Sequence, residues 1–313
     1  MNCEYGLLGY PLGHSFSRAY FNNKFAKEGI DAEYLNFELQ SVEELPQLLA
    51  EHPRLRGLNV TIPHKQAVIP LLDELSDEAR AIGAVNVIRI ERQESGTAKP
   101  YLKGFNSDVI GFVESIRPLL QPHHKRALVL GTGGASKAVC RGLEKLGIEW
   151  RYVSRKRQTA TPAPDGPITA PSASPKSPIT VPSGSPEGPL TPKVPAPDGP
   201  ITAPSASPKK PITVPSGSPE GPLTYSDLTP SFIADYTVIV NCTPLGMFPR
   251  IDSSPELPYA ALSKHHLLFD LVYNPGITQF MRQGRRFGAT VKNGLEMLHL
   301  QADASWDFWN GKD

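Results

Sequence analysis

The chain has 313 residues, 39% of them hydrophobic, and carries a formal net charge of +1 with a pI near 7.7. This length accommodates two domains of ordinary size, and the near-neutral charge gives no reason to expect nucleic acid or an anionic membrane as a partner. The N-terminus lacks a basic stretch followed by an apolar run, and no segment approaches the roughly eighteen uninterrupted apolar residues of a membrane span, so we expect a cytoplasmic globular protein.

Short apolar runs of strand length alternate along the chain with segments of helical spacing. Strands are predicted at residues 5–9, 32–39, 56–62, 84–90, 126–131, 148–154, 237–243 and 267–273, and helices at 43–52 and 136–146. This alternation predicts an α/β protein with mostly parallel sheets. The histidines and the three cysteines show no spacing typical of metal ligands, so no metal site is expected.

The clearest local motif is RALVLGTGGASKAVCRGLEKLG at residues 126–147, in which an apolar strand is followed by glycines and an amphipathic helix. Glycines let the backbone approach a pyrophosphate, and the helix N-terminus presents free amides to it. We therefore expect a dinucleotide to bind at Gly131, Gly133, Gly134 and Ala135. A glycine turn that only joins the strand to the helix is the structural alternative.

The next predicted strand ends in a basic cluster formed by Ser154, Arg155, Lys156 and Arg157. An NAD-binding unit usually has an acidic residue at this place, which binds the ribose hydroxyl. Arginine instead binds a 2′-phosphate with paired donors, whereas a carboxylate would repel it. We therefore expect NADP as the cofactor, with a solvated basic turn as the alternative interpretation.

Residues 159–224 differ in composition from the rest of the chain. They hold 19 of its 33 prolines and no aromatic residue, and the block at 162–191 recurs at 195–224 with one change. Such a period also occurs in solenoid folds. Here, however, the few apolar side chains cannot offset the backbone entropy that ordering would cost. We expect a disordered, proline-rich insertion within the cofactor domain.

Further motifs carry a family resemblance. The stretches GYPLGHSFSRAYFN, NVTIPHK, GAVN and GFNSD are followed in order by GTGGAS, NCTPLGM, DLVYNP and NGLEMLHLQA. This ordered set resembles the shikimate dehydrogenase family along nearly the whole chain outside the insertion. The cofactor motif NRT of the family reads Ser154, Arg155, Lys156 here, which keeps the arginine but changes its neighbours. In the substrate-binding motifs, Arg18 stands where proline is common, and the usual NTD reads Asn106, Ser107, Asp108. Neither change removes a functional group from the expected chemistry.

The resemblance implies roles for individual residues. Lys65 and Asp108 would form the catalytic pair, and Ser15 and Ser17 would bind the substrate carboxylate. The residues implied to surround the substrate ring and its hydroxyls are Thr61, Asn86, Tyr273 and Gln301. The family uses NADPH to reduce the ketone of 3-dehydroshikimate to shikimate, on the route to aromatic amino acids.

The chemistry of ketone reduction explains these residue types independently of the resemblance. A ketone that accepts a hydride becomes an alkoxide, which needs a proton or a cation within hydrogen-bond reach. Lys65 supplies either one, and Asp108 can orient its ammonium group. Hydroxyl and amide side chains suit a polyhydroxy ring because each ring hydroxyl both donates and accepts a hydrogen bond.

The predicted organisation is a substrate domain at 1–107, completed by a C-terminal helix at 294–313, and an NADP-binding Rossmann domain at 108–293. We expect a monomer or homodimer that acts on a small molecule, 3-dehydroshikimate or shikimate, without nucleic acid or membrane partners. Two alternatives stay open. One is a quinate or dual quinate/shikimate dehydrogenase, and the other is a non-catalytic Rossmann-type protein that presents PxxP-like segments to a partner.

Overall fold

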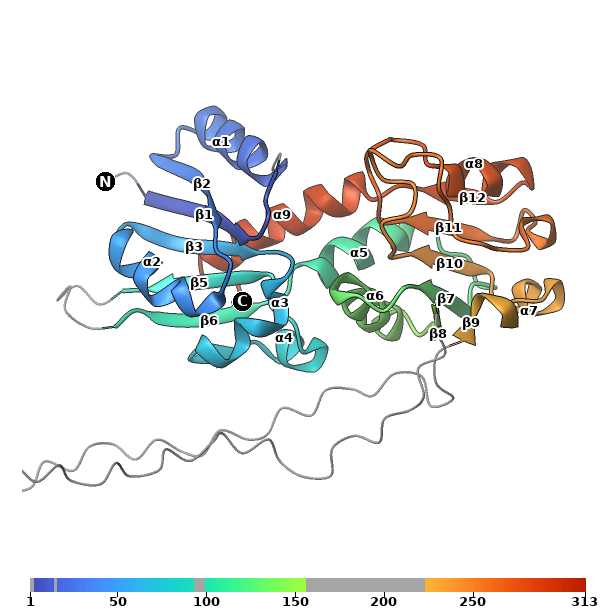
Figure 1. Cartoon of the computed structure of the whole chain (residues 1–313), viewed down its shortest axis with the longest axis horizontal. Coiled ribbons are helices and arrows are strands. Elements are labelled where there is room, and N and C mark those ends of the chain that lie inside the picture. Colours follow the sequence, from blue (N-terminus) through green and yellow to red (C-terminus); the bar gives the residue numbers. More distant parts are fainter. Residues whose placement is uncertain (1–2, 14–15, 93–98, 156–222) are drawn as a thin grey trace, which may run out of the picture. The chain divides into compact units, whose positions relative to one another are not determined.

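The computed structural model describes residues 3–13, 16–92, 99–155 and 223–313, and its strands form two six-stranded sheets (Figure 1). Within these ranges no helix is long and apolar enough to cross a membrane. Short 3-10 turns lie at Val42–Glu44, Ile69–Leu71, Arg117–Leu119, Tyr225–Asp227 and Tyr259–Ala261.

The first sheet has the strand order β2-β1-β3-β5-β6-β4. Its strands are β1 (Cys3–Gly9), β2 (Ala32–Glu38), β3 (Leu55–Val60), β4 (Glu74–Leu75), β5 (Val87–Glu91) and β6 (Tyr101–Phe105). β5 pairs antiparallel with β3 and with β6, and the remaining neighbours are parallel. The connecting helices are α1 (Phe16–Glu28), α2 (Leu45–Glu51), α3 (His64–Ala67) and α4 (Asp77–Ile82).

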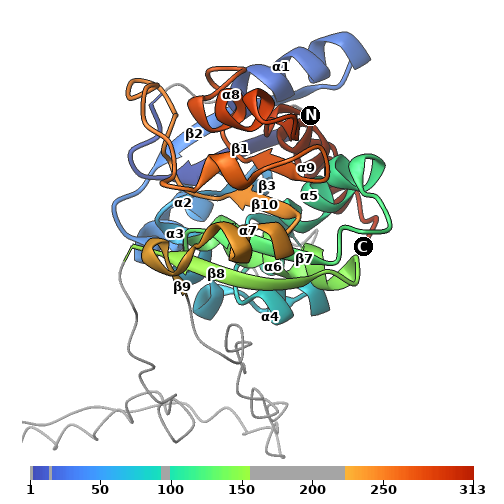
Figure 2. The ribbon, with the colours of Figure 1, turned by 90° about the vertical axis from the view of Figure 1, so that its right-hand side faces the viewer.

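The second sheet is parallel throughout, in the order β12-β11-β10-β7-β8-β9 (Figure 1). Figure 2 shows its strands β10, β7, β8 and β9 from a second direction. Its strands are β7 (Arg126–Leu130), β8 (Glu149–Ser154), β9 (Leu223–Thr224), β10 (Val238–Asn241), β11 (Leu267–Asp270) and β12 (Thr290–Lys292). The helices of this half are α5 (Asp108–Ile116), α6 (Gly134–Lys145), α7 (Pro230–Asp235) and α8 (Gln279–Arg286), and α9 (Leu295–Trp309) ends the chain. The predicted α/β class with mostly parallel sheets is confirmed.

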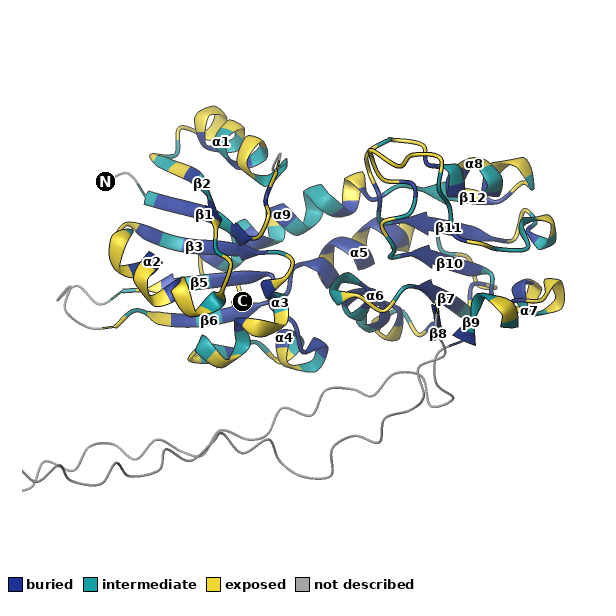
Figure 3. Cartoon of the chain, viewed as in Figure 1, coloured by how far each residue is buried: buried dark blue, intermediate teal, exposed yellow. Residues whose placement is uncertain are grey.

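The central strands of the second sheet are buried on both faces, which explains their uninterrupted apolar sequences (Figure 3). All four residues of β10 and all four of β11 are buried. Each fully buried valine, leucine or phenylalanine side chain contributes about 1.5–3 kcal/mol relative to an exposed one. The amphipathic helix α6 covers one face, where Val139 and Leu143 join the same apolar cluster as Val129.

A glycine allows α5 and α9 to approach each other closely. A Cβ atom at Gly111 would lie 2.6 Å from the main-chain oxygen of Met297 and 3.0 Å from the Cβ of Gln301, so a larger residue there would force the helices apart. This close approach places the first turn of α5 beside the middle of α9. Asp108 and Gln301, which are far apart in sequence, are brought into one region by it.

The structure describes the last two residues of the predicted insertion as a strand. Leu223 and Thr224 form β9, which pairs with Val153 and Ser154 of β8. The Leu223 side chain is buried beside Val153, and the main-chain amide of Thr224 donates to Asp227 at 2.8 Å. The same Pro-Leu-Thr triplet occurs within the repeat, so local composition gives no sign of a strand. Pairing with β8 and an apolar contact create the strand, and residues 159–222 lie outside the described ranges.

Candidate active site

The two side chains predicted to be catalytic lie together. Lys65 is in the short helix that follows β3, and Asp108 is the first residue of α5. Lys65 Nζ lies 2.6 Å from Asp108 Oδ2, and the two side chains are only 17% and 12% exposed. Because water screens such a pair less than a surface pair, the carboxylate orients the ammonium group firmly. Among the described residues only Asp108 hydrogen-bonds to this ammonium group, which leaves two of its three hydrogens for a ligand.

Asn86 holds the same carboxylate from a second direction. Its Nδ2 donates to Asp108 Oδ1 at 2.9 Å and to Ser107 Oγ at 3.0 Å. The main-chain amide of Ser107 donates to Asn86 Oδ1 at 2.7 Å, so the amide orientation of this buried residue is determined. Each oxygen of Asp108 therefore accepts a hydrogen bond from a different side chain, which fixes the rotation of the carboxylate.

Gln301 reaches the same region from α9. Its Oε1 lies 3.3 Å from Ser107 Oγ, and its Nε2 donates to the main-chain oxygen of Leu298 at 3.0 Å. Ser107 is thus in contact with both Asn86 and Gln301. The start of α5 therefore brings together four predicted site residues from separate parts of the chain: Lys65, Asn86, Asp108 and Gln301.

Of the two serines predicted to bind the substrate carboxylate, the structure describes one. Ser15 lies outside the described residues, whereas Ser17 on α1 is half-buried and lies near the hydroxyl of Tyr34. Burial raises the pKa of the Tyr34 hydroxyl, which stays protonated and donates to Asn59 Oδ1 at 2.8 Å. Thr61 directly follows β3 and is half-buried, four residues before the lysine of the catalytic pair.

Tyr273 lies beside the first residue of α1. Its ring centroid is 6.2 Å from that of Phe16, the residue between the two predicted carboxylate-binding serines. Phe16 also contacts His299 of α9 with an edge-to-face geometry at 5.1 Å. Tyr273 is 38% exposed, so its ring and hydroxyl are accessible to a small molecule.

The loop that carries Tyr273 is anchored by a buried carboxylate. Asp270 Oδ1 accepts from the main-chain amide of Val272 at 3.0 Å and from Asn241 Nδ2 at 2.9 Å, and its Oδ2 accepts from Thr278 Oγ1 at 2.6 Å. Burial raises the pKa of Asp270 to about 6 in spite of these donors. The carboxylate links the ends of β10 and β11 to the start of α8, so both ends of the loop are held.

The glycine-rich turn has the geometry that a dinucleotide requires. Gly131 has a φ of +99°, which side chains rarely tolerate. Cβ atoms placed at Gly133 and Gly134 would meet nothing within 4 Å, so there is open space in front of the α6 N-terminus. Ala135 lies in the first turn of α6. Free amides and open space at a helix N-terminus fit a pyrophosphate.

The basic cluster after β8 is described only at its start. Ser154 is buried at the end of β8, and Arg155 is exposed directly after it. Burial raises the pKa of Tyr225 to about 12, while the nearby charge of Arg155 acts in the opposite direction. The guanidinium therefore lies near the start of the chain that follows β9. Lys156 and Arg157 lie outside the described residues.

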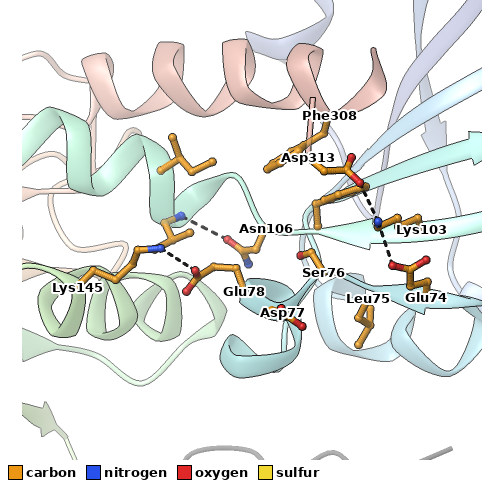
Figure 4. A pocket seen from close by; sticks show the side chains of 13 residues that line it. Glu74, Leu75, Ser76, Asp77, Glu78, Lys103, Asn106, Lys145, Phe308 and Asp313 are labelled. Atoms are coloured by element: carbon orange, nitrogen blue, oxygen red, sulfur yellow. Dashed lines mark hydrogen bonds and ion pairs between the residues drawn. The ribbon is translucent and has the colours of Figure 1, made fainter. Parts of the chain in front are cut away.

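A pocket of ≈ 430 Å³ lies elsewhere, among α4, β6, α5 and the C-terminal end (Figure 4). Most of its charged side chains form ion pairs with one another: Lys103 pairs with Asp313 at 2.8 Å and Glu74 at 3.0 Å, and Lys145 pairs with Glu78 at 2.7 Å. None of the predicted site residues lines it. Across the described ranges, no group of three or more His, Cys, Asp or Glu side chains could hold a metal ion.

Sequence reasoning missed four buried polar residues that support the site. Two of them lie inside quoted motifs, Asn59 in NVTIPHK and Ser107 in GFNSD, so their motifs offered a signal. The other two, Tyr34 and Ser305, lie in an apolar strand and a helix and carry no local signal of a polar role. Their contribution depends on which side chains the fold brings beside them.

A glycine-rich turn between a strand and a helix of a parallel sheet, together with a partly buried Lys65–Asp108 pair, fits the class of dinucleotide-dependent oxidoreductases. Residues 7–88 of this chain match the model of the shikimate dehydrogenase substrate binding domain. The chain is 31% identical to the shikimate dehydrogenase (NADP(+)) of Desulforamulus reducens, with 98% of this chain and 89% of that relative covered. The corresponding protein of Syntrophomonas wolfei is 33% identical over 95% of this chain and 85% of its own length. This chain belongs to the shikimate dehydrogenase family.

Solved structures agree with this assignment. The shikimate 5-dehydrogenase of Thermus thermophilus, in complex with NADP(H) and shikimate, has a TM-score of 0.68 and 26% identity, covering 99% of this chain and 94% of that one. The shikimate dehydrogenase of Aquifex aeolicus has a TM-score of 0.68 and 28% identity, covering 99% and 93%. The expected fold of a substrate-binding unit and a Rossmann-type unit is confirmed.

Proposed function

We propose that this protein is an NADP-dependent shikimate dehydrogenase, which reversibly reduces 3-dehydroshikimate to shikimate in aromatic amino acid biosynthesis. The observation that carries the proposal is the half-buried Lys65–Asp108 pair at 2.6 Å, in a chain of this family. In this proposal the substrate domain comprises 1–107 with 294–313, and the cofactor domain comprises 108–293. Residues 159–222 are a proline-rich repeat insertion in the cofactor domain that turnover does not require.

The described residues suit NADP as the cofactor. The open space at Gly133 and Gly134 accommodates the pyrophosphate at the α6 N-terminus, and the exposed guanidinium of Arg155 is available for the 2′-phosphate. Bound NADPH supplies the hydride. The remaining chemistry, which is to bind the ketone, orient it and protonate its oxygen, falls to side chains of this chain.

Lys65 is the proposed proton donor in the reductive direction. Its ammonium group keeps two hydrogens that do not point at Asp108, and one of them can bind the ketone oxygen as negative charge develops there. Asp108, held by Asn86, keeps the ammonium in place throughout. In the oxidative direction the same lysine, once neutral, accepts the hydroxyl proton.

The remaining polar residues are proposed to bind the substrate. Ser15 and Ser17 would bind the carboxylate, while the ring hydroxyls would meet Thr61, Asn86, Tyr273 and Gln301. Hydrogen bonds already made by these residues limit what each can still offer. Asn86 has used both of its N–H groups, so it offers only an acceptor, whereas Gln301 keeps one N–H to donate.

Steady-state kinetics test the proposed function. We expect kcat/KM for shikimate with NADP to exceed the values for quinate with NADP and for shikimate with NAD by at least about tenfold, since each ill-fitting polar group costs about 1.4 kcal/mol or more. Equal or higher values for quinate would assign the protein to the quinate or dual-specificity class. Binding of both ligands without turnover would instead support a non-catalytic role.

Arg155→Ala is expected to weaken NADPH binding roughly 10- to 100-fold and to leave NADH binding nearly unchanged, because only NADPH carries the 2′-phosphate. Dissociation constants measured by fluorescence titration would check this. Arg151→Ala, four residues earlier and within β8, is a control for loss of an arginine from this part of the chain. Equal weakening for both cofactors would show that Arg155 supports the fold or the shared adenosine instead.

A further inference from the structure

Buried hydroxyl and amide side chains form a continuous string beside the proposed site. From Ser17, which lies near the Tyr34 hydroxyl, the string continues through hydrogen bonds that join Tyr34, Asn59, Ser305 and Ser107 in turn. The last four side chains are at most 6% exposed. The string connects α1 and the first sheet to α9 and to the start of α5. Burying so many polar groups is tolerable only because every one of them is hydrogen-bonded.

The direction of each hydrogen bond at Ser305 can be deduced. Its Oγ donates its single hydrogen to the main-chain oxygen of Gln301 at 2.8 Å. It therefore accepts from Asn59 Nδ2 at 2.9 Å and, at 3.1 Å, from Ser107 Oγ. Asn59 must then present its nitrogen to Ser305 and its oxygen to Tyr34, so its amide cannot turn over without leaving buried groups unpaired.

The same reasoning determines the orientation of Gln301. Ser107 Oγ accepts from Asn86 Nδ2 at 3.0 Å, and its own hydrogen is shared between Ser305 Oγ and Gln301 Oε1. Gln301 Nε2 donates to Leu298. Its oxygen therefore faces Ser107, and one N–H stays available for a ligand. Without the Ser107 hydroxyl, the Gln301 oxygen would lose its hydrogen-bond donor among the described residues, and only the bond from Nε2 to Leu298 would orient the amide.

We propose that Ser107 is a positioning residue for substrate binding that acts through the amide of Gln301, and that Ser305 supports it through the hydrogen bond between the two serines. This inference rests on the proposed function, because it concerns which hydrogen-bonding groups face the substrate hydroxyls. The two serines touch no reacting atom. An amide side chain has nearly the same shape in its two orientations. The Ser107 hydroxyl helps to determine which end of the Gln301 amide accepts and which end donates.

The test begins with Ser107→Ala in the full-length chain. We expect the KM for shikimate to rise roughly 3- to 12-fold, as for the loss of one neutral hydrogen bond, with kcat changed less than about twofold and the KM for NADP unchanged. Ser107→Thr keeps the hydroxyl and should restore the KM. Ser305→Ala should act in the same direction.

Ser115→Ala is the matched control. Ser115 lies on α5, which begins directly after Ser107, and is 1% exposed. Its hydroxyl donates to the main-chain oxygen of Phe112 at 3.0 Å, and it is not part of the string of hydrogen-bonded side chains. A structural role alone would give Ser107→Ala and Ser115→Ala the same loss of Tm and the same unchanged KM. That outcome, in an enzyme that turns over shikimate, would overturn the inference while leaving the proposed function intact.

A double-mutant cycle asks whether Ser107 acts through Gln301. In a Gln301→Ala background we expect Ser107→Ala to have little further effect on the KM, because the amide that it orients is gone. Additive effects would contradict positioning. If the wild type oxidises quinate and not shikimate, the proposed substrate is wrong, and the same cycle run with quinate still decides whether Ser107 positions Gln301.

Discussion

Lys65→Ala is expected to lower kcat by a factor on the order of 10² to 10⁴ while the protein stays folded and binds NADP normally. The substitution removes the group proposed to protonate the ketone oxygen, and no other described cation lies within hydrogen-bond distance of Asp108. Stopped-flow or steady-state assays with shikimate would measure the effect, and circular dichroism would report the fold.

Lys103→Ala provides a matched control for this substitution. Lys103 is also a half-buried lysine, 15% exposed, that pairs with carboxylates of Glu74 and Asp313, but none of these is a predicted site residue. We expect it to lower stability and to change kcat less than about threefold. A folded Lys65→Ala protein with near-normal kcat would disprove the role of Lys65 as proton donor.

Removing the proline-rich repeat tests whether the insertion contributes to stability or to turnover. Excision of 159–222, which joins Gln158 to Leu223, should leave kcat nearly unchanged and increase the free energy of unfolding by roughly 2 kcal/mol, since the loop after β8 becomes much shorter. Excision of 159–224 should instead cost about 2–4 kcal/mol, because it also removes the buried Leu223 side chain and the Thr224 cap. Urea unfolding of both variants would give the difference.

A shorter excision, of one copy of the repeat, is the matched control for the 159–224 excision. Excision of 192–224 removes 33 residues yet leaves Leu190 and Thr191 directly before Tyr225, in the same local sequence that precedes it now. This variant should be at least as stable as the intact chain, because an identical Leu-Thr pair can form β9 and halving the loop adds only about 0.6 kcal/mol. Equal stability of the 159–222 and 159–224 excisions would show that β9 contributes nothing. Loss of turnover in the 159–222 excision would show that the repeat takes part in the reaction.

Elements whose stability depends on local sequence pattern were predictable. The strand at Arg126–Leu130, the glycines that follow it and the amphipathic helix α6 lie where the periodicity placed them, because a strand buried on both faces must be apolar throughout. Lys65 and Asp108 were predicted from motifs, since the resemblance names them. These features are encoded within a few neighbouring residues.

Only the tertiary structure determined which buried polar side chains hydrogen-bond to one another. Tyr34 and Ser305 are 271 positions apart in the chain, and each is an ordinary residue of its own element until Asn59 lies between them. Leu223 likewise repeats an earlier triplet, and only β8 and a buried contact turn its copy into a strand. A hydrogen bond or a strand pairing acts over about 3–5 Å in space, irrespective of separation along the chain, so periodicity and composition carry no record of it.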